Sequence, residues 1–269
     1  MKSTKVVYLI LASADKEHQL DEMTQKQTWA KDNKYEIIWL RGAAETFFED
    51  KSRNLFVEIE DSYENILEKT RLGIEWCIKN ITFDFLVRGN VSTYFKTEEI
   101  EHYLSKQTTE QPFFGGYIDV FNVADYVQKI EYVNGGAIFM NLSSALEITS
   151  INSTDYRTRP DDVALSEYMQ SRGAKLTWIP RGNISNTIVL KDRMYFRLKS
   201  SSFALMASKR MNHLDKVFSE RKFPKRMRYK FAYYLDELTN FKRNFSNTKY
   251  LFLSIYSVLV NTLRFRKYE

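Results

Sequence analysis

Apolar runs of strand length alternate with helical patterns through about the first hundred residues, and this alternation restricts the fold more than any other feature. Strands that alternate with helices form mainly parallel sheets covered by helices, so we predict an α/β fold. The strands are expected over 6–12, 35–40, 55–59 and 83–87. The helices are expected over 19–32, over 61–80 with Asp61 or Ser62 as the N-cap, and over 97–104.

The strand expected over 83–87 ends abruptly at Arg88, Gly89 and Asn90. Ligands of open α/β sheets bind beyond the carboxyl ends of strands, so the polar residues at this point are candidates for a binding site. The alternative is an ordinary turn at the end of a buried strand.

The segment after residue 104 is rich in turn signals. Four of the nine glycines occur there in pairs, at 115–116 and 135–136, which indicates turns, bulges or close approach to a ligand. Helices are expected to begin at Ser143 and at the Asp161-Asp162 pair, the second of them running to Arg172, and a last strand is expected over 176–179.

Charge divides the chain into two parts. Residues 191–269 hold 19 basic and 6 acidic side chains, whereas residues 1–190 hold 21 basic and 28 acidic side chains. We therefore expect one domain over 1–190 and a basic, aromatic, mainly helical C-terminal extension over 191–269. Such an excess of positive charge indicates an anionic partner, which could be phosphate, lipid head groups or nucleic acid.

Two observations concern the cellular location. No run of about 18 apolar residues occurs, so no membrane-spanning helix is expected. The single cysteine, Cys77, excludes an internal disulfide and fits a reducing compartment. We expect a cytoplasmic protein, and the segment 250–267 fits either a helix packed on the core or an interfacial helix on the inner face of an anionic membrane.

Five short motifs, in order along the chain, resemble those of the β-1,3-galactosyltransferase and Fringe group of GT-A glycosyltransferases, in a divergent bacterial form. The most specific is Asp-Ser-Tyr-Glu-Asn-Ile-Leu-Glu-Lys-Thr at 61–70, followed by Trp76. The others are Lys-Gln-Thr-Trp at 26–29, the strand 83–88, the segment 132–141 and Asp-Asp-Val at 161–163. The resemblance covers residues 5–180 and implies a GT-A (Rossmann-like) fold with a mixed, mainly parallel sheet.

The same resemblance implies transfer of a sugar from a nucleotide-sugar donor, such as a UDP-sugar, to an acceptor hydroxyl. Asp162 would be the catalytic base, with Asp161 as the alternate, although either carboxylate could merely cap a helix. The donor would contact Ser13, Asp61, Asn90 and Ser92. Tyr132, Gly135 and Gly136 would line the acceptor side, while Lys69 and Trp29 would support the fold.

The chain departs from the family at its metal site. Asn90-Val91-Ser92 stands where the family has Asp-x-Asp, and hard cations prefer carboxylate oxygens. A divalent metal is therefore not expected, and either catalysis is lost or fixed cations stabilise the leaving diphosphate. Arg88, Arg193, Arg197 and Lys199 are the candidates, and the last three would point to one side of an extended segment. The alternative is a solvated basic surface.

We therefore expect an inverting, metal-independent glycosyltransferase that acts on a surface-glycan or lipid-linked acceptor, as in the synthesis of lipopolysaccharide or capsule. A non-catalytic glycan- or nucleotide-binding relic of the same fold is the alternative. Nucleic acid is not an expected partner, because no nucleic-acid-binding motif occurs and the first two thirds of the chain are acidic.

Overall fold

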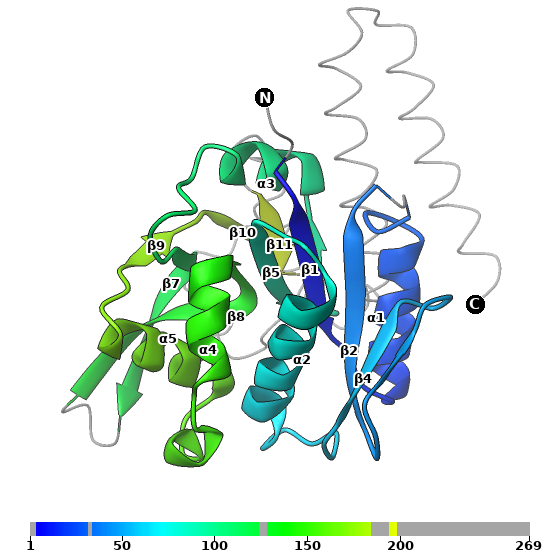
Figure 1. The fold of residues 1–269 in the computed structure, drawn as a ribbon, viewed down its shortest axis with the longest axis horizontal. Helices are drawn as coiled ribbons and strands as arrows, with labels where there is room; N and C mark the ends of the chain where they lie inside the picture. Colours follow the sequence, from blue (N-terminus) through cyan, green and yellow to red (C-terminus); the bar gives the residue numbers. More distant parts are fainter. Residues whose placement is uncertain (1–3, 32–33, 124–127, 184–193, 198–269) are drawn as a thin grey trace, which may run out of the picture.

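The computed structural model describes residues 4–31, 34–123, 128–183 and 194–197, which form three layers (Figure 1). The middle layer is an eight-stranded sheet with the order β3-β4-β2-β1-β5-β8-β7-β9. Its strands are β1 (Val6–Leu11), β2 (Glu36–Ala43), β3 (Phe47–Glu49), β4 (Asn54–Glu58), β5 (Phe85–Asn90), β7 (Phe114–Val123), β8 (Gln128–Asn141) and β9 (Leu176–Trp178).

The sheet is parallel at its centre and mixed towards its edges. Strands β4, β2, β1 and β5 run parallel to one another. Strand β8 is antiparallel to β5 and forms a long hairpin with β7, whose outer neighbour β9 is parallel to it. The prediction of a mixed, mainly parallel sheet covered by helices is confirmed.

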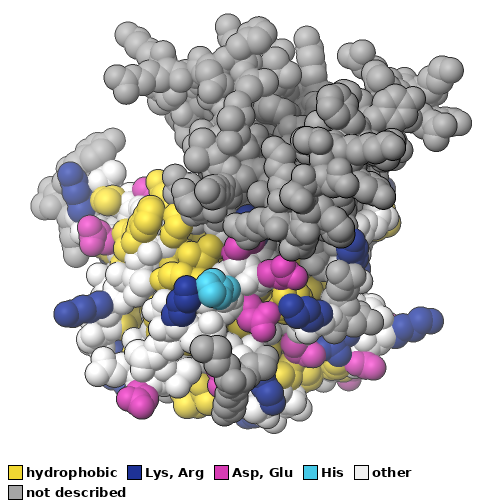
Figure 2. Space-filling model, turned by 90° about the horizontal axis from the view of Figure 1, so that it is seen from above, with side chains coloured by type: hydrophobic (Ala, Val, Ile, Leu, Met, Phe, Trp, Pro, Cys, Tyr) yellow, Lys and Arg dark blue, Asp and Glu magenta, His cyan; other side chains and the backbone are white. Residues whose placement is uncertain are grey.

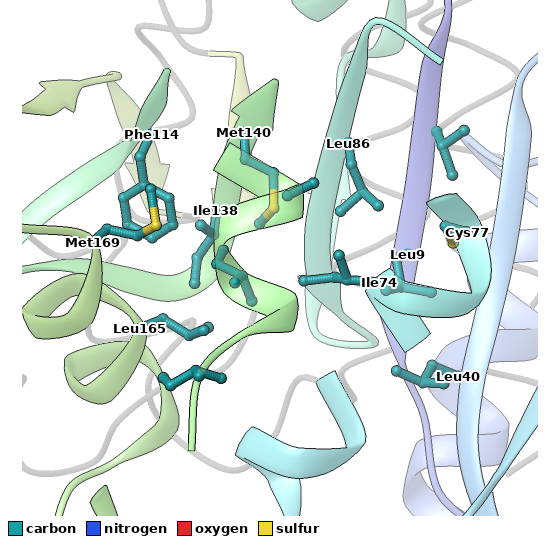
Figure 3. Packing of buried hydrophobic residues seen from close by; sticks show 14 of the residues in the cluster. Leu9, Leu40, Ile74, Cys77, Leu86, Phe114, Ile138, Met140, Leu165 and Met169 are labelled. Atoms are coloured by element: carbon teal, nitrogen blue, oxygen red, sulfur yellow. The ribbon is translucent and has the colours of Figure 1, made fainter. Parts of the chain in front are cut away.

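Helices α2 (Ile66–Asn80), α4 (Leu142–Thr149) and α5 (Asp161–Ser171) cover one face of the sheet. Figure 3 shows their apolar side chains against the sheet, with Ile74 and Cys77 of α2 near Leu9 and Leu86. Strand β1 reads as a continuous apolar run because both of its faces are buried. Each buried Leu or Ile stabilises the fold by about 1.5–3 kcal/mol.

The opposite face carries α1 (Lys16–Lys26), α3 (Thr97–Leu104) and a small second sheet. This sheet has the order β10-β11-β6, with β6 at Thr93–Phe95, β10 at Arg181–Asn183 and β11 at Tyr195–Arg197. Figure 2 views the molecule from the side that carries α3 in Figure 1, and acidic and basic side chains are interspersed over its described part.

Several predicted boundaries are corrected by the structure. Helix α1 spans 16–26 rather than 19–32, because the chain turns after Lys26 and Trp29 packs on Tyr8 and Phe95. Helix α2 begins at Ile66, and its N-cap is Asn65 rather than Asp61 or Ser62. The carboxyl group of Asp61 is engaged instead by Lys69.

The paired glycines were expected in turns, in bulges or at a close approach to a ligand, and both pairs lie within strands of the β7–β8 hairpin. The ladder between the two strands shifts register after Gly116, so a bulge is present there, as one of the alternatives predicted. Likewise, β5 continues through Arg88 to Asn90, so these polar residues form the last part of the strand rather than its exit.

Among the described residues, none of the helices has the length and apolar character that crossing a membrane requires. The expected C-terminal helix over 250–267, together with Arg193 and Lys199, lies outside the described residues. Of the expected extension beyond 190, only residues 194–197 are described, and β11 there pairs with β6.

Candidate active site

A buried arginine joins the end of β5 to the start of α5. Arg88 lies opposite Leu9 and Ile138 in the sheet, so its side chain points to the face that α5 covers. Only 2% of Arg88 is exposed, and a charge placed in such an apolar layer requires a partner. The guanidinium forms an ion pair with Asp161, and its Nη1 donates to the Gly135 carbonyl at 2.9 Å.

Gly135 of β8 connects the residues of this site. Its carbonyl accepts from Arg88 Nη1 and from Asn90 Nδ2, the latter at 3.3 Å, while its N–H donates to Asp162 Oδ2 at 2.8 Å. A Cβ at this position would lie 2.9 Å from Arg88 Nη1 and 3.0 Å from Asp162 Oδ2. Glycine is therefore required here by close packing, not by an unusual backbone conformation.

The two carboxylates at the start of α5 have different surroundings. Asp161 is paired with a full positive charge, whereas the donors to Asp162 among the described residues are the neutral N–H groups of Gly135 and, at 3.0 Å, of Val163. Burial raises the pKa of Asp162, the charge of Asp161 raises it further, and the N–H donors and Arg88 partly offset these effects. The N-cap of α5 is Pro160, so neither carboxylate is the N-cap residue.

Asn90 organises the turn between β5 and β6. Its Oδ1 accepts from the backbone N–H and the hydroxyl of Ser92, at 3.2 and 2.7 Å. The hydroxyl of Thr93 donates to the Gly136 carbonyl at 2.7 Å. These contacts join the turn to β8, where Asn90 shares Gly135 with Arg88 and Asp162.

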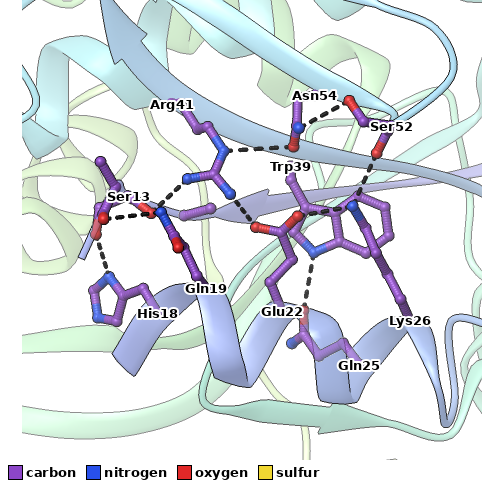
Figure 4. Close-up of polar contacts among 12 residues, drawn as sticks. Ser13, His18, Gln19, Glu22, Gln25, Lys26, Trp39, Arg41, Ser52 and Asn54 are labelled. Carbon is purple, nitrogen blue, oxygen red and sulfur yellow. Dashed lines mark hydrogen bonds and ion pairs between the residues drawn. The ribbon is translucent and has the colours of Figure 1, made fainter. Parts of the chain in front are cut away.

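A second group of polar residues lies at the carboxyl ends of β1, β2 and β4. The amino group of Lys69 is paired with Asp61 and donates to the Ala12 carbonyl at 3.2 Å. Arg41 is paired with Glu22 and also donates to the Ser13 carbonyl (Figure 4). The Ser13 hydroxyl lies 2.6 Å from His18 Nδ1.

The two groups share one edge of the sheet, because the Val91 N–H donates to the Leu11 carbonyl at 3.3 Å, beside Ala12 and Ser13. The structure thus brings together most of the residues that the sequence singled out. These are Ser13, Asp61, Arg88, Asn90, Ser92, Gly135, Gly136, Asp161 and Asp162.

Tyr132 is placed differently. It precedes Val133, which packs among the residues covered by α5, and consecutive strand residues point to opposite faces. The Tyr132 side chain therefore points to the face away from α5.

The late basic residues are only partly described. In the ladder between β11 and β6, Arg197 pairs with Thr93, so its backbone lies beside the Asn90–Thr93 turn. Residues 195–197 are extended. Arg193 and Lys199 lie outside the described residues, so the arrangement of these cations on one side of the segment stays a prediction.

The expectation that the site works without a divalent metal stays a prediction. Within the described part of the chain, no group of three or more His, Cys, Asp or Glu side chains is arranged to hold one. Asn90 and Ser92, the two residues expected to depart from an Asp-x-Asp motif, are hydrogen-bonded to each other through Asn90 Oδ1 and the Ser92 hydroxyl. Cys77 is also unsuited to such a role, because burial raises the pKa of its thiol to about 12.

Two residues near the site, Tyr63 and Gln25, were not predicted from the sequence. Tyr63, on the loop between β4 and α2, is 72% exposed, and its pKa is raised by partial burial and by the charges of Asp161 and Asp162. Gln25 of α1 is fully buried and donates to three carbonyls of the segment 90–93. Tyr63 lies within the most specific motif, which was a usable signal, whereas no pattern marked Gln25.

No protein-family model matches this chain, and no curated protein matches it. Among solved structures, it is similar to a glycosyltransferase involved in glycosylation of the major capsid of PBCV-1, with 10% identity and a TM-score of 0.45. That likeness covers 79% of this chain and 98% of the other. A second similar structure is A197 from STIV, with 7% identity, a TM-score of 0.35 and coverage of 65% and 82%. Neither likeness bears on activity.

Proposed function

We propose that this protein is an inverting glycosyltransferase with a nucleotide-sugar donor and Asp162 as its general base. The observation that carries the proposal is the pair of carboxylates at the carboxyl edge of the sheet, one paired with Arg88 and the other in no ion pair among the described residues. Ligands of such sheets bind at this edge.

The proposed chemistry is a single displacement. The acceptor hydroxyl attacks C1 of the donor sugar, the bond from C1 to the diphosphate oxygen breaks, and Asp162 takes the hydroxyl proton. The nucleoside diphosphate leaves with the bonding electron pair. A base works best when its pKa lies close to the working pH, and burial shifts the pKa of Asp162 in that direction.

Asp161 is less suited to this step. Protonation of its carboxyl group would break the ion pair and leave the Arg88 charge buried without a counter-charge. We therefore assign proton transfer to Asp162 and the positioning of Arg88 to Asp161.

The donor diphosphate needs a cation that is not already paired, and the three cations described at the carboxyl edge of the sheet are all paired. Arg88, Lys69 and Arg41, the cations described there, are each paired with a carboxylate. Arg88 is also buried, so we reassign it from a diphosphate ligand to a positioning residue. We propose that Arg197, with Arg193 and Lys199, supplies the charge from β11 and its flanks without a metal.

Ser13 and Asp61 would contact the nucleoside, and Asn90 and Ser92 would contact sugar or ribose hydroxyls. We place the acceptor beside Tyr63, since aromatic side chains line many small-molecule sites and this ring is exposed near both carboxylates. The acceptor would be a surface glycan or a lipid-linked precursor at the cytoplasmic face of a membrane.

A panel of nucleotide-sugars tests the proposal by thermal shift and by release of nucleoside diphosphate. We expect one donor to raise the melting temperature and to be turned over, with turnover unchanged by excess chelator. Asp162→Asn should bind the same donor and lose about a thousandfold in turnover. Full turnover by Asp162→Asn, or no donor binding by the wild type, would overturn the proposal.

The second candidate is a non-catalytic binding relic, which the absence of carboxylates at Asn90 and Ser92 favours. In that case the wild type would bind a donor or its nucleotide but would show no turnover with any acceptor.

A further inference from the structure

We propose that Gln25 is a positioning residue that holds the Asn90–Thr93 turn in its donor-binding form. This inference rests on the proposed function, in which Asn90 and Ser92 contact the donor. Gln25 lies on α1, on the face of the sheet opposite to the carboxylates, and would reach the ligand only through the turn.

The amide nitrogen of Gln25 contacts three carbonyls of this one turn. Its Nε2 lies 3.3 Å from the Asn90 carbonyl, 3.2 Å from that of Val91 and 3.0 Å from that of Thr93. Its Oε1 accepts from Trp39 Nε1 at 3.1 Å, as Figure 4 shows. The side chain is fully buried, so water does not compete for these contacts.

The geometry explains why an amide is required. Carbonyl oxygens repel one another when they converge, and the two hydrogens of one amide nitrogen can satisfy them together. A carboxylate of the same shape would face these carbonyls without a hydrogen to donate. A thioether of similar size would offer these carbonyls no hydrogen, and the loss of a hydrogen bond costs about 0.5–1.5 kcal/mol.

The turn that Gln25 holds is connected to β8 at one end and to β11 at the other. On one side, Asn90 reaches the Gly135 carbonyl, which also binds Arg88. On the other side, Thr93 pairs with Arg197 in the small sheet. A displaced turn would therefore alter the donor contacts of Asn90 and Ser92 and the placement of β11 together.

A purely structural role would give a different result, and Trp39 supplies the control. Trp39→Phe removes the hydrogen bond to Gln25 Oε1 while the contacts between Gln25 and the turn stay in place. If Gln25 only anchors α1, then Gln25→Met and Trp39→Phe should lose stability and leave ligand affinity unchanged in the folded fraction. Gln27→Glu, at an exposed neighbouring position, controls for the added charge of Gln25→Glu.

The experiment is calorimetric titration of the full chain with UDP, GDP, CDP and dTDP. For the nucleotide that the wild type binds, we expect about a tenfold or greater loss of affinity in Gln25→Met and Gln25→Glu, and a change within about twofold in Trp39→Phe and Gln27→Glu. If Gln25→Met does not fold, Gln25→Asn, which retains a buried amide on a shorter stem, is titrated in its place.

Each other outcome has a defined meaning. Wild-type affinity in folded Gln25→Met, an equal loss in Trp39→Phe, or failure of both Gln25→Met and Gln25→Asn to fold would overturn the inference alone. A wild type that binds none of the four nucleotides would overturn the inference and the proposed function together.

Discussion

The guanidinium of Arg88 is paired with the carboxylate of Asp161 inside the protein, across 73 residues of sequence. Buried ion pairs contribute little net stability, because both groups lose their hydration, but removal of one partner is costly. The pair links the end of β5 to the start of α5. It therefore fixes the position of Asp162, the next residue of the chain, relative to the edge where we place the ligand.

Replacing Arg88 with methionine should damage both stability and activity. The substitution leaves the partly buried Asp161 without its counter-charge, which costs up to about 3–5 kcal/mol in free energy of unfolding. It also removes a positive charge that lowers the pKa of Asp162. Thermal unfolding and turnover of a donor test this, and the double variant with Asp161→Asn should recover part of the stability. No recovery in the double variant would show that the ion pair is not the cause.

The raised pKa of Asp162 predicts that this residue makes the folded protein less stable as the pH rises. A carboxyl group whose pKa is higher in the folded than in the unfolded state binds its proton more tightly when folded. The folded state is therefore favoured at low pH, and stability falls as the pH rises through the unfolded and then the folded pKa. Asp162→Asn removes this pH dependence, although it also loses one of the two N–H contacts.

We accordingly expect the melting temperature of Asp162→Asn, relative to the wild type, to increase between about pH 4 and about pH 8. Thermal melts of both proteins across this range measure the difference directly. A difference that stays constant or decreases with pH would contradict the raised pKa.

Gly135 should not tolerate a methyl group. The added Cβ would lie 2.9 Å from Arg88 Nη1 and 3.0 Å from Asp162 Oδ2, so one of the two side chains must move. Such overpacking costs about 1–3 kcal/mol, and Gly135→Ala should also reduce turnover by about tenfold or more. Gly136→Ala is the control, because the atom nearest to its added Cβ, Asn134 Oδ1, would lie farther away, at 3.3 Å. Equal effects of the two substitutions on turnover would remove Gly135 from the site.

The sequence predicted the parts of the fold that local patterns determine. The apolar run that forms β1 is continuous because both faces are buried, and the start of α5 is marked by Pro160 and two acidic residues. The β7–β8 hairpin was not predicted, because its paired glycines resemble turn signals. Gly115 is required instead by packing, since a Cβ there would lie 2.6 Å from the Thr177 carbonyl of β9.

The candidate site was predicted as a set of residues but not as a network. The sequence indicated that Arg88, Asn90 and Asp162 belong to one edge, and the structure links all three through Gly135. It did not indicate that Arg88 is paired with Asp161, because such pairs depend on the register of strands far apart in sequence. The role of Gln25 was hidden for the same reason, since its partners lie 65 to 68 residues away.

Tyr63 gives the test of the acceptor side. Its loop is held at one end by the pair of Asp61 with Lys69 and at the other by Asn65, whose side chain donates to the Glu60 carbonyl at 3.1 Å. The ring is nevertheless 72% exposed, and its pKa is raised in part by Asp161 and Asp162. An exposed ring on an anchored loop, near enough to the proposed base for that charge to raise its pKa, could pack against a sugar bound there.

Tyr63→Ala should therefore raise the KM for the acceptor by about tenfold, while the affinity for the donor nucleotide stays within about twofold of the wild type. Tyr63→Phe should retain most of the acceptor affinity, because the ring rather than the hydroxyl makes the contact. Tyr132→Ala, on the face away from α5, should leave the KM for the acceptor unchanged. If Tyr132→Ala raises this KM and Tyr63→Ala does not, the acceptor binds on the opposite face of the sheet, and Asp162 could not reach its hydroxyl.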